Sequence, residues 1–322
     1  MKPTGALPAQ LTSFIGRQAT IDAVVRRLAE GRLVSLVGPG GCGKTRLAIE
    51  VARRTTEGSK GPVFFVDFSG LSDPVLVPGA VSLALGLPER PGQDPLERLT
   101  ARLSKRKLLL LLDNCEHVVD ACTRLVGTLV GKCPGVQVLA TSRERLGAFG
   151  EAVVTVGGLE LPERADNGDD GWAERSEAGK LFVDRARMAT ADFVVDDPGA
   201  LASICQRLDG IPLGLELAAA RARLMSLGAI SEGLSDCFSL LVASERAGPG
   251  RHKTLLASIE WSCGLLSDDE RGLLHRLSVF ASGFALAAAK AVGAGGDAER
   301  RNILGLLTSL VDKSLVQALP GA

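Results

Sequence analysis

The sequence predicts an α/β protein, with a parallel five-stranded sheet in its first half and a helical second half. Three observations favour this fold class. Apolar, strand-like runs alternate with amphipathic helix patterns through about residue 157, and a glycine-rich loop follows the first of these runs. The alternation is absent from residue 178 onward. Alternating strands and helices form a parallel sheet covered on both faces, because right-handed crossovers place each helix against the sheet.

The composition is that of a globular protein. The chain has 322 residues, of which 46% are hydrophobic, so two or three domains are expected. It contains no apolar run long enough to span a membrane and no signal-peptide core at its N-terminus. Seven cysteines form neither a disulfide scaffold nor a zinc pattern, so we expect a cytoplasmic protein with reduced thiols. Lysine and arginine balance aspartate and glutamate at 37 each, and no basic cluster indicates nucleic-acid binding.

The elements before residue 90 follow from hydrophobic periodicity and from the glycines that interrupt it. Ile21, Val24 and Leu28 fall on one face of a helix, which Gly31 ends. The strand-like runs are almost wholly apolar, as expected of parallel strands that are buried on both faces. The expected elements are this helix, a strand over 32–37, a helix over 44–57, a strand over 63–68 and a short helix over 78–85.

The elements from residue 94 to residue 157 continue the alternation. Asp94 and Pro95 begin a helix, because aspartate caps a first turn and proline suits its first position. Residues 107–112 are mostly leucine and fit a buried strand or a buried helix; their short length and the polar residues after them favour a strand that ends at Asp113. The remaining expected elements are a helix over 118–129 and strands over 136–140 and 152–156.

The glycine-rich loop carries a recognisable binding pattern. Gly38, Gly43, Lys44 and Thr45 fill the pattern G-x-x-x-x-G-K-[ST] between a strand and a helix, the setting in which this pattern binds phosphate. Glycines let the backbone close around an anion, and the amide groups and the helix N-terminus offer partial positive charge. The Lys44 ammonium can reach the β- and γ-phosphates, and the Thr45 hydroxyl can bind Mg²⁺. We therefore expect a nucleotide site here.

Two further side chains are expected at the same edge of the sheet. Asp113 ends one strand and Arg143 follows another, and ligands of such sheets bind beyond the carboxyl ends of the strands. Asp113 suits an acid that holds Mg²⁺, with a solvated strand-end carboxylate as the alternative. Arg143 suits a γ-phosphate contact, with a surface salt bridge as the alternative. The residue after Asp113 is Asn114, whose amide cannot act as the base that activates water, so the identity of that base is not decided. Glu116 is either the base or a surface residue.

The second half is divided by polar and glycine-rich stretches. We expect a nucleotide-binding domain over 1–160, an exposed linker over 161–177, a helical domain over 178–250 and a last domain over 251–322. The expected helices are 178–189, 200–208, one that begins at Pro212 and runs to about 225, 254–266, 268–280 with a capping box from Ser267 to Glu270, 284–292 and 299–312, and residues 314–317 suit a strand.

Several separated motifs resemble one family, the STAND class of signalling ATPases in its NB-ARC-like form. The chain is most similar to the ATPase modules of actinomycete LuxR-type and antibiotic-pathway transcriptional regulators. The motifs are LTSFIGR at 11–17, LVGPGGCGKTRLA at 36–48, LLLLLDNCEH at 108–117, LATSRERLG at 139–147, ICQRLDGIPLGLELAAAR at 204–221, SIEWSCGLL at 258–266, LSVFASGF at 277–284 and LVDKSLV at 310–316. The resemblance implies a P-loop NTPase domain of the AAA-like (ASCE) type, then a helical domain and a winged-helix-like domain, which we expect to be incomplete.

The resemblance also implies a set of site residues for ATP or ADP with Mg²⁺. Lys44, Asp113, Glu116 and Arg143 are the expected catalytic residues, and Thr45 and Asp113 the expected metal ligands. Asp113 ends the Walker B strand, Arg143 matches the sensor arginine, and Pro212 matches a proline that packs by the base. The expected nucleotide contacts are Ile15, Arg17, Gly38, Pro39, Gly40, Gly41, Cys42, Gly43, Lys44, Thr45, Arg46 and Pro212.

These features predict a nucleotide-driven switch with slow ATPase activity that acts in transcriptional regulation through a homo-oligomer or an effector partner. No direct contact with nucleic acid or membrane is expected. A second hypothesis, supported by Asn114, is a scaffold that holds ADP without turnover. A small-molecule kinase would need an acceptor site and a lid, which the helical half does not obviously supply, and direct DNA binding would need basic character in the last section.

Overall fold

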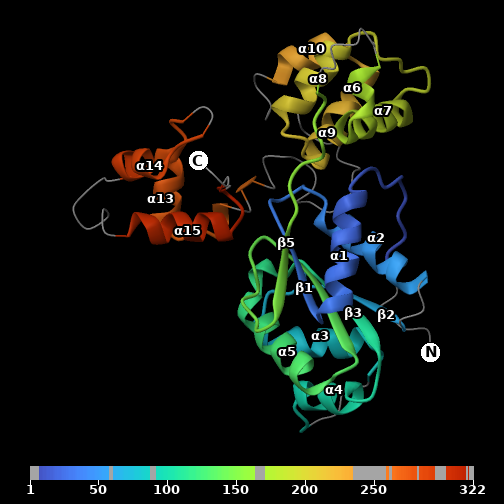
Figure 1. The fold of residues 1–322 in the computed structure, drawn as a ribbon, viewed down its shortest axis with the longest axis vertical. Coiled ribbons are helices and arrows are strands. Elements are labelled where there is room, and N and C mark those ends of the chain that lie inside the picture. The colour runs from blue at the N-terminus through green and yellow to red at the C-terminus, as the bar shows by residue number, and fades with distance from the viewer. Residues whose placement is uncertain are drawn as a thin grey trace.

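The structure is a computed structural model that describes residues 7–57, 61–87, 92–163, 171–234, 259–260, 263–280, 283–293, 302–316 and 318. Figure 1 shows three groups of elements: a sheet with helices α1 to α5, a group of helices α6 to α10 beyond one end of the strands, and helices α13 to α15 to one side. Each of the two helical groups has its own cluster of buried apolar side chains.

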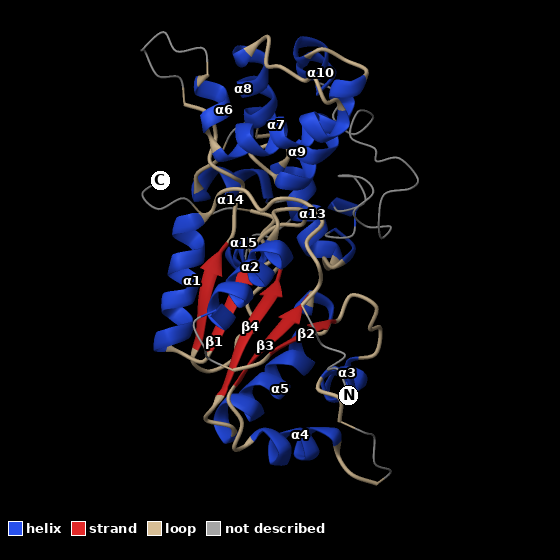
Figure 2. Cartoon of the chain, turned by 90° about the vertical axis from the view of Figure 1, so that its right-hand side faces the viewer, coloured by secondary structure: helices blue, strands red, loops and turns tan. Residues whose placement is uncertain are grey.

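The sheet has five parallel strands in the order β2-β3-β4-β1-β5, which confirms the predicted fold class. In Figure 2 the arrowheads of the strands point toward helices α7 and α9, so the carboxyl ends of the strands face the second group. β1 and β3 are buried along their whole length, as their apolar sequences predict. The strands are β1 (Leu33–Val37), β2 (Val63–Asp67), β3 (Leu108–Asp113), β4 (Val136–Ser142) and β5 (Glu151–Thr155).

β4 is longer than the sequence predicts. The strand was expected over 136–140, but Thr141 and Ser142 continue it because they pair with Leu36 and Val37 of β1. This extension carries the start of the next loop, and with it Arg143, as far along the sheet as the end of β1. The pairing partner, which no local pattern reveals, sets the end of the strand.

Helices cover both faces of the sheet. α1 and α2 share one core cluster with β1, and α3, α4 and α5 share the other with β2 and β3. The Asp94 carboxylate caps α4 by accepting a hydrogen bond of 3.1 Å from the amide of Leu96, as the sequence predicts. The helices are α1 (Gln18–Glu30), α2 (Lys44–Glu57), α3 (Val77–Ala84), α4 (Pro95–Leu103) and α5 (Val119–Lys132), with 3-10 turns η1 (Pro74–Leu76) and η2 (Cys115–His117).

The second group contains α6 (Trp172–Arg175), α7 (Glu177–Ala189), α8 (Pro198–Arg207), α9 (Pro212–Ala219), η3 (Ala220–Arg223) and α10 (Leu227–Gly233). Two features differ from the sequence-based expectation. Residues 171–177 were expected to be exposed linker, but Ala173 is fully buried in the core of this group. The helix that begins at Pro212 tightens into a 3-10 turn at Ala220, before the expected end.

The last group contains α13 (Asp268–Leu277), α14 (Leu286–Gly293) and α15 (Ile303–Asp312). The predicted capping box is present, since Ser267 and Glu270 each bond the backbone amide of the other. The prediction of a strand over 314–317 is wrong for residues 314–316, which the structure describes. Ser314 has a φ of 57° and the chain turns back on α15. Most of the expected helix over 254–266, Trp261 included, lies outside the described residues.

No helix in the described parts of the chain is long and apolar enough to cross a membrane.

Candidate functional site

The glycine loop lies between the end of β1 and the start of α2. Gly41 and Gly43 have φ values of 78° and 89°, in the left-handed region that favours glycine. The ammonium of Lys44 donates hydrogen bonds to the carbonyl oxygens of Gly38 at 2.7 Å and Pro39 at 2.9 Å. The loop therefore has the conformation that the sequence pattern requires, and it holds the lysine above its own backbone.

Asp113 meets this loop at the carboxyl end of β3. Its Oδ1 accepts hydrogen bonds from the hydroxyls of Thr45 at 2.8 Å and Thr141 at 2.5 Å, and its Oδ2 accepts one from the side chain of Asn114 at 3.0 Å. The residue is only 2% exposed. Burial raises the pKa of this carboxyl to about 6, and the hydrogen bonds from Thr141 and Thr45 oppose that rise.

Asn114, the residue directly after Asp113, contributes a hydrogen-bond donor to the site. Its backbone is left-handed, with a φ of 60°. Its side-chain nitrogen, Nδ2, donates hydrogen bonds to Oδ2 of Asp113 and, at 2.9 Å, to Oδ1 of Asp67. Two carboxylates are thereby joined by one amide, where a third carboxylate would repel both. Sequence reasoning missed Asp67 and Thr141, although Asp67 ends β2 and Thr141 is the next-to-last residue of β4, at the edge that carries Asp113.

Glu116 and Arg143 form a buried ion pair. The Nε of Arg143 lies 3.4 Å from Oε1 of Glu116, and each residue is 8% exposed. The other carboxylate oxygen of Glu116 is buried and has no hydrogen-bond partner in the described structure. The alternative of Glu116 as a surface residue is wrong, because it is buried. For Arg143 the alternative is right about a salt bridge but wrong about its location, since the pair with Glu116 is buried.

Arg17 lies beside the loop, under the second group of helices. Its Nη2 donates a hydrogen bond of 2.7 Å to the carbonyl oxygen of Gly157, and its Nη1 is buried without a partner among the described residues. A Cβ built on Gly43 would lie 3.9 Å from Nη1 and 3.7 Å from the ring of Pro212. The structure therefore brings Arg17, Gly43 and Pro212 together, as their expected roles require, and burial lowers the pKa of the Arg17 guanidinium.

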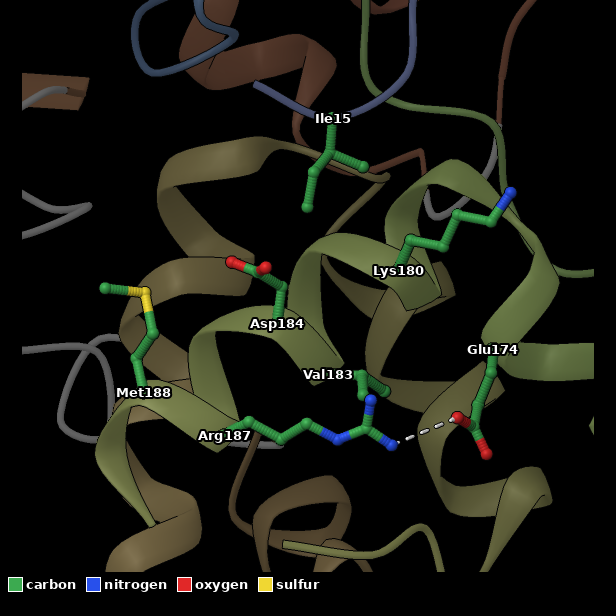
Figure 3. A pocket seen from close by; sticks show the side chains of 7 residues that line it. All are labelled: Ile15, Glu174, Lys180, Val183, Asp184, Arg187 and Met188. Carbon is green, nitrogen blue, oxygen red and sulfur yellow. Dashed lines mark ion pairs between the residues drawn. The ribbon is translucent and has the colours of Figure 1, made fainter. Parts of the chain in front are cut away.

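Ile15 packs against the second group of helices. Figure 3 shows its side chain over helix α7, above Asp184, where it lines a pocket of about 580 Å³. The other residues of this pocket all belong to α6 and α7: Glu174, Lys180, Val183, Asp184, Arg187 and Met188. No residue of the glycine loop lines it, so this pocket is separate from the phosphate-binding loop.

Arg46 lies on α2, the helix that follows the glycine loop and is called the loop helix below. It connects this helix to the second group. Its guanidinium lies 3.3 Å from the carboxylate of Glu216 on α9 and donates to the carbonyl oxygens of Thr12 and Ser13. Glu216 also pairs with Arg185 of α7 at 2.9 Å. Next to this network, the amide of Leu213 donates a hydrogen bond of 3.2 Å to the carbonyl oxygen of Gly41. The start of α9 thus contacts the glycine loop directly.

Comparisons with known proteins place the chain among bacterial regulators, although no model of a known protein family matches it. A Mycobacterium tuberculosis protein, provisionally named an HTH-type transcriptional regulator, is 43% identical over 293 residues, 90% of this chain and 32% of that protein. An uncharacterized protein of the same species is 40% identical over 309 residues, 95% of this chain and 75% of its own length. Regulatory protein AfsR of Streptomyces griseus is 30% identical over 340 residues, 100% of this chain and 32% of AfsR.

The chain belongs to a family of actinomycete proteins that includes segments of named transcriptional regulators. It spans about a third of the length of the regulators that it matches, 32% in each of the two cases above. Solved structures agree with the fold. The Walker-type ATPase of Pyrococcus abyssi superposes with a TM-score of 0.57 at 13% identity, over 96% of this chain and 93% of that one. ORC2 of Aeropyrum pernix, in ADPNP and ADP complexes, gives 0.52 at 15%, over 98% and 90%.

Proposed function

We propose that this chain is a STAND-class module, a nucleotide-dependent switch that binds ATP or ADP with Mg²⁺ at the glycine loop. The observation that carries the proposal is the pairing of Thr45 with Asp113 at 2.8 Å, directly below a loop that the second group of helices also contacts. One residue from the loop helix and one from β3 thus place two oxygen ligands side by side. Relatives that are named regulators support a role in control of transcription.

The side chains around the loop fit a nucleotide. Gly41 and Gly43 give the left-handed backbone that turns amide groups toward an anion, and Lys44 supplies a positive charge above them. The buried Nη1 of Arg17, which has no partner in the described part of the chain, is a donor that a nucleotide oxygen or ring nitrogen would satisfy. Pro212 lies against the same loop and offers an apolar surface to a base. Ile15, which lines the pocket on α6 and α7, would contribute an apolar contact to the base.

Thr45 and Asp113 would hold Mg²⁺ together with the phosphates. Within the described residues, no group of three histidine, cysteine or acidic side chains could hold a metal alone, so most ligands would come from nucleotide and water. When bound, the ion would supply positive charge that stabilises charge developing on the phosphates. Asn114 and Thr141 would keep the Asp113 carboxylate in one orientation, as supporting residues do at metal sites.

The same arrangement favours slow turnover. Glu116 is the candidate base, and Arg143 is the candidate sensor of the γ-phosphate, but each is paired with the other in a buried contact. While the Nε of Arg143 pairs with Glu116, part of the guanidinium charge is neutralised and its attraction for a phosphate is weaker. Hydrolysis would therefore depend on separating this pair, which suits a switch better than a fast enzyme.

The contacts between the loop and α9 would carry the nucleotide state to the rest of the chain. Gly41, Arg46 and Pro212 connect the loop to helices that also pack on Glu216 and Arg185. A change at the phosphates would alter these contacts and so the position of the second group. We propose that the output is control of a regulator partner or of a second copy of the chain.

Nucleotide titration with a matched variant tests the proposal. Purified protein should show saturable ADP and ATP binding by isothermal titration calorimetry, and Lys44→Ala should weaken binding of both by on the order of tenfold or more. Lys105→Ala, at an exposed lysine away from the loop, is the control. Equal binding by wild type and Lys44→Ala, or no binding by the wild type, would reject the proposal.

A second candidate function is a scaffold that holds ADP without turnover. The pairing of Glu116 with Arg143 favours it, because a nearby positive charge makes the candidate base a weaker proton acceptor. Phosphate release by wild type, Asp113→Ala and Glu116→Ala decides between the two. Equal background rates in all three would support the scaffold, and a wild-type rate above both variants would support the switch with hydrolysis.

A further inference from the structure

The last group of helices touches the loop that carries Arg143. The hydroxyl of Ser314 donates a hydrogen bond of 2.6 Å to the backbone carbonyl of Arg143, and Asp312 lies 3.6 Å from the guanidinium of Arg145. These contacts join two segments, 143–145 and 312–314, that are about half the chain apart in sequence. We call the two segments together the sensor clamp.

The backbone of Ser314 indicates that its side chain matters. Its φ of 57° places it in the left-handed region after α15, where helices usually have glycine. A residue with a side chain is less favourable there than glycine. The hydroxyl that glycine would lack is the group that reaches Arg143. Strain is thus found where a side chain makes the contact between the two segments.

The clamp is anchored from within the last group. The ammonium of Lys313, between the two clamp residues, lies 2.7 Å from the carboxylate of Glu270, which also accepts hydrogen bonds from Ser309 and from the backbone of Ser267. Glu270 is only 6% exposed. The segment 312–314 is therefore fixed to α13 and is not a free chain end that happens to touch the loop.

On its other side, the clamp meets the candidate base. Ser314 bonds the backbone carbonyl of Arg143, and the guanidinium of the same Arg143 pairs with Glu116 at 3.4 Å. Residue 143 therefore connects the last group, through its backbone, with Glu116, through its side chain. Only one residue separates that backbone contact from the Arg145–Asp312 pair, so the loop is held at two nearby points.

We infer that Asp312 and Ser314 are positioning residues that hold Arg143 on Glu116 and so restrain its contact with a γ-phosphate. This inference rests on the function proposed above. In this arrangement the last group of helices sets the threshold at which the third phosphate is sensed. Weakening the clamp lets Arg143 leave Glu116 more readily, which favours binding of a triphosphate over a diphosphate and frees the candidate base.

Two variants and two matched controls test this inference. Ser314→Gly removes the hydroxyl while relieving the left-handed backbone, and Asp312→Asn removes one charge. Ser278→Ala removes a hydroxyl that bonds a carbonyl within its own helix group at 2.7 Å, and Asp268→Asn removes an exposed charge paired at 3.7 Å. The readouts are hydrogen exchange of the amides in 143–146 without nucleotide, and the ratio of affinities for a non-hydrolysable ATP analogue and ADP.

The expected result is faster exchange in 143–146 and an affinity ratio shifted about fivefold toward the ATP analogue in both clamp variants, with neither change in the controls. If the wild type binds both nucleotides but the exchange rates and the affinity ratio of the clamp variants stay within twofold of its values, the clamp is overturned and the proposed function is not. A shift toward ADP also overturns it, because Asp312 and Ser314 would then assist the phosphate contact. Failure of the wild type to bind either nucleotide overturns both.

Discussion

The hydroxyl of Thr45 and Oδ1 of Asp113 lie 2.8 Å apart, although 68 positions separate the two residues in sequence. The same oxygen accepts a hydrogen bond from Thr141 of the neighbouring strand. Three elements, the loop helix, β3 and β4, therefore converge on one carboxylate oxygen. This convergence orients the carboxylate and is the geometric basis of the proposed Mg²⁺ site.

Asp113→Asn should remove the Mg²⁺ dependence of nucleotide binding. The variant retains an oxygen that can accept from Thr45 and Thr141, but it lacks the charge that a hard cation prefers. We expect Mg²⁺-supported affinity for ATP to fall by on the order of tenfold or more, measured by titration with and without the ion. Asp192→Asn, at an exposed acid between α7 and α8 and outside the site, is the control. If Asp113→Asn kept the full effect of Mg²⁺, the assignment of this ligand would be wrong.

Gly158→Ala should destabilise the junction between β5 and the second group of helices, whereas Gly157→Ala should not. A Cβ on Gly158 would lie 1.9 Å from the backbone oxygen of Asp209, while one on Gly157 would meet nothing within 4 Å. The clash is with backbone and cannot be relieved by a side-chain rotation. We expect Gly158→Ala to lower the free energy of unfolding by about 2–3 kcal/mol in urea titrations. Similar stability of the two variants would contradict this packing.

Arg17→Met should weaken nucleotide binding more than it weakens the fold. The methionine keeps much of the apolar stem but removes the buried Nη1, whose missing hydrogen bond a nucleotide would supply. A hydrogen bond from a charged donor is worth about 1.5–3 kcal/mol, so affinity for ADP should fall about tenfold or more. Calorimetry measures it, and the ADP-induced rise in Tm should shrink in parallel. Arg26→Met, exposed on the same helix, is the control; an unchanged affinity in Arg17→Met would exclude the contact.

Glu270→Gln should destabilise the last group of helices at neutral pH but not in strong acid. Burial disfavours the charged form of Glu270, but hydrogen bonds from Lys313, Ser309 and Ser267 outweigh it and lower its pKa from 4.5 to about 2. A carboxyl whose folded pKa is lowered adds stability above its unfolded pKa, and that stability is lost as pH falls from about 4.5 to about 2. The stability gap between wild type and variant, from unfolding curves at several pH values, should close in this window. A gap that did not change with pH would mean that the charge of Glu270 adds nothing.

Some features of the fold follow from local sequence alone. The bounds of α2 agree with the prediction at both ends, because a glycine loop precedes it and its apolar positions repeat with helical spacing. The capping box at Ser267 and Glu270 is equally local, since the two residues lie within one helical turn. Residues 108–112 are different. Leucine favours helices when isolated, and the run becomes β3 because β2 and β4 pair with it on both sides.

The glycine loop, the alternation that forms the parallel sheet, and the candidates Lys44, Thr45, Asp113 and Arg143 are all recognisable from the sequence, because each depends on residues close together along the chain. Which side chains meet depends on tertiary packing. Packing pairs Arg143 with Glu116 inside the protein, joins Asn114 to Asp67, and brings Ser314 to the carbonyl of Arg143. Periodicity records which face of an element is buried, but a contact between distant segments depends on how whole elements pack, and no local pattern specifies that.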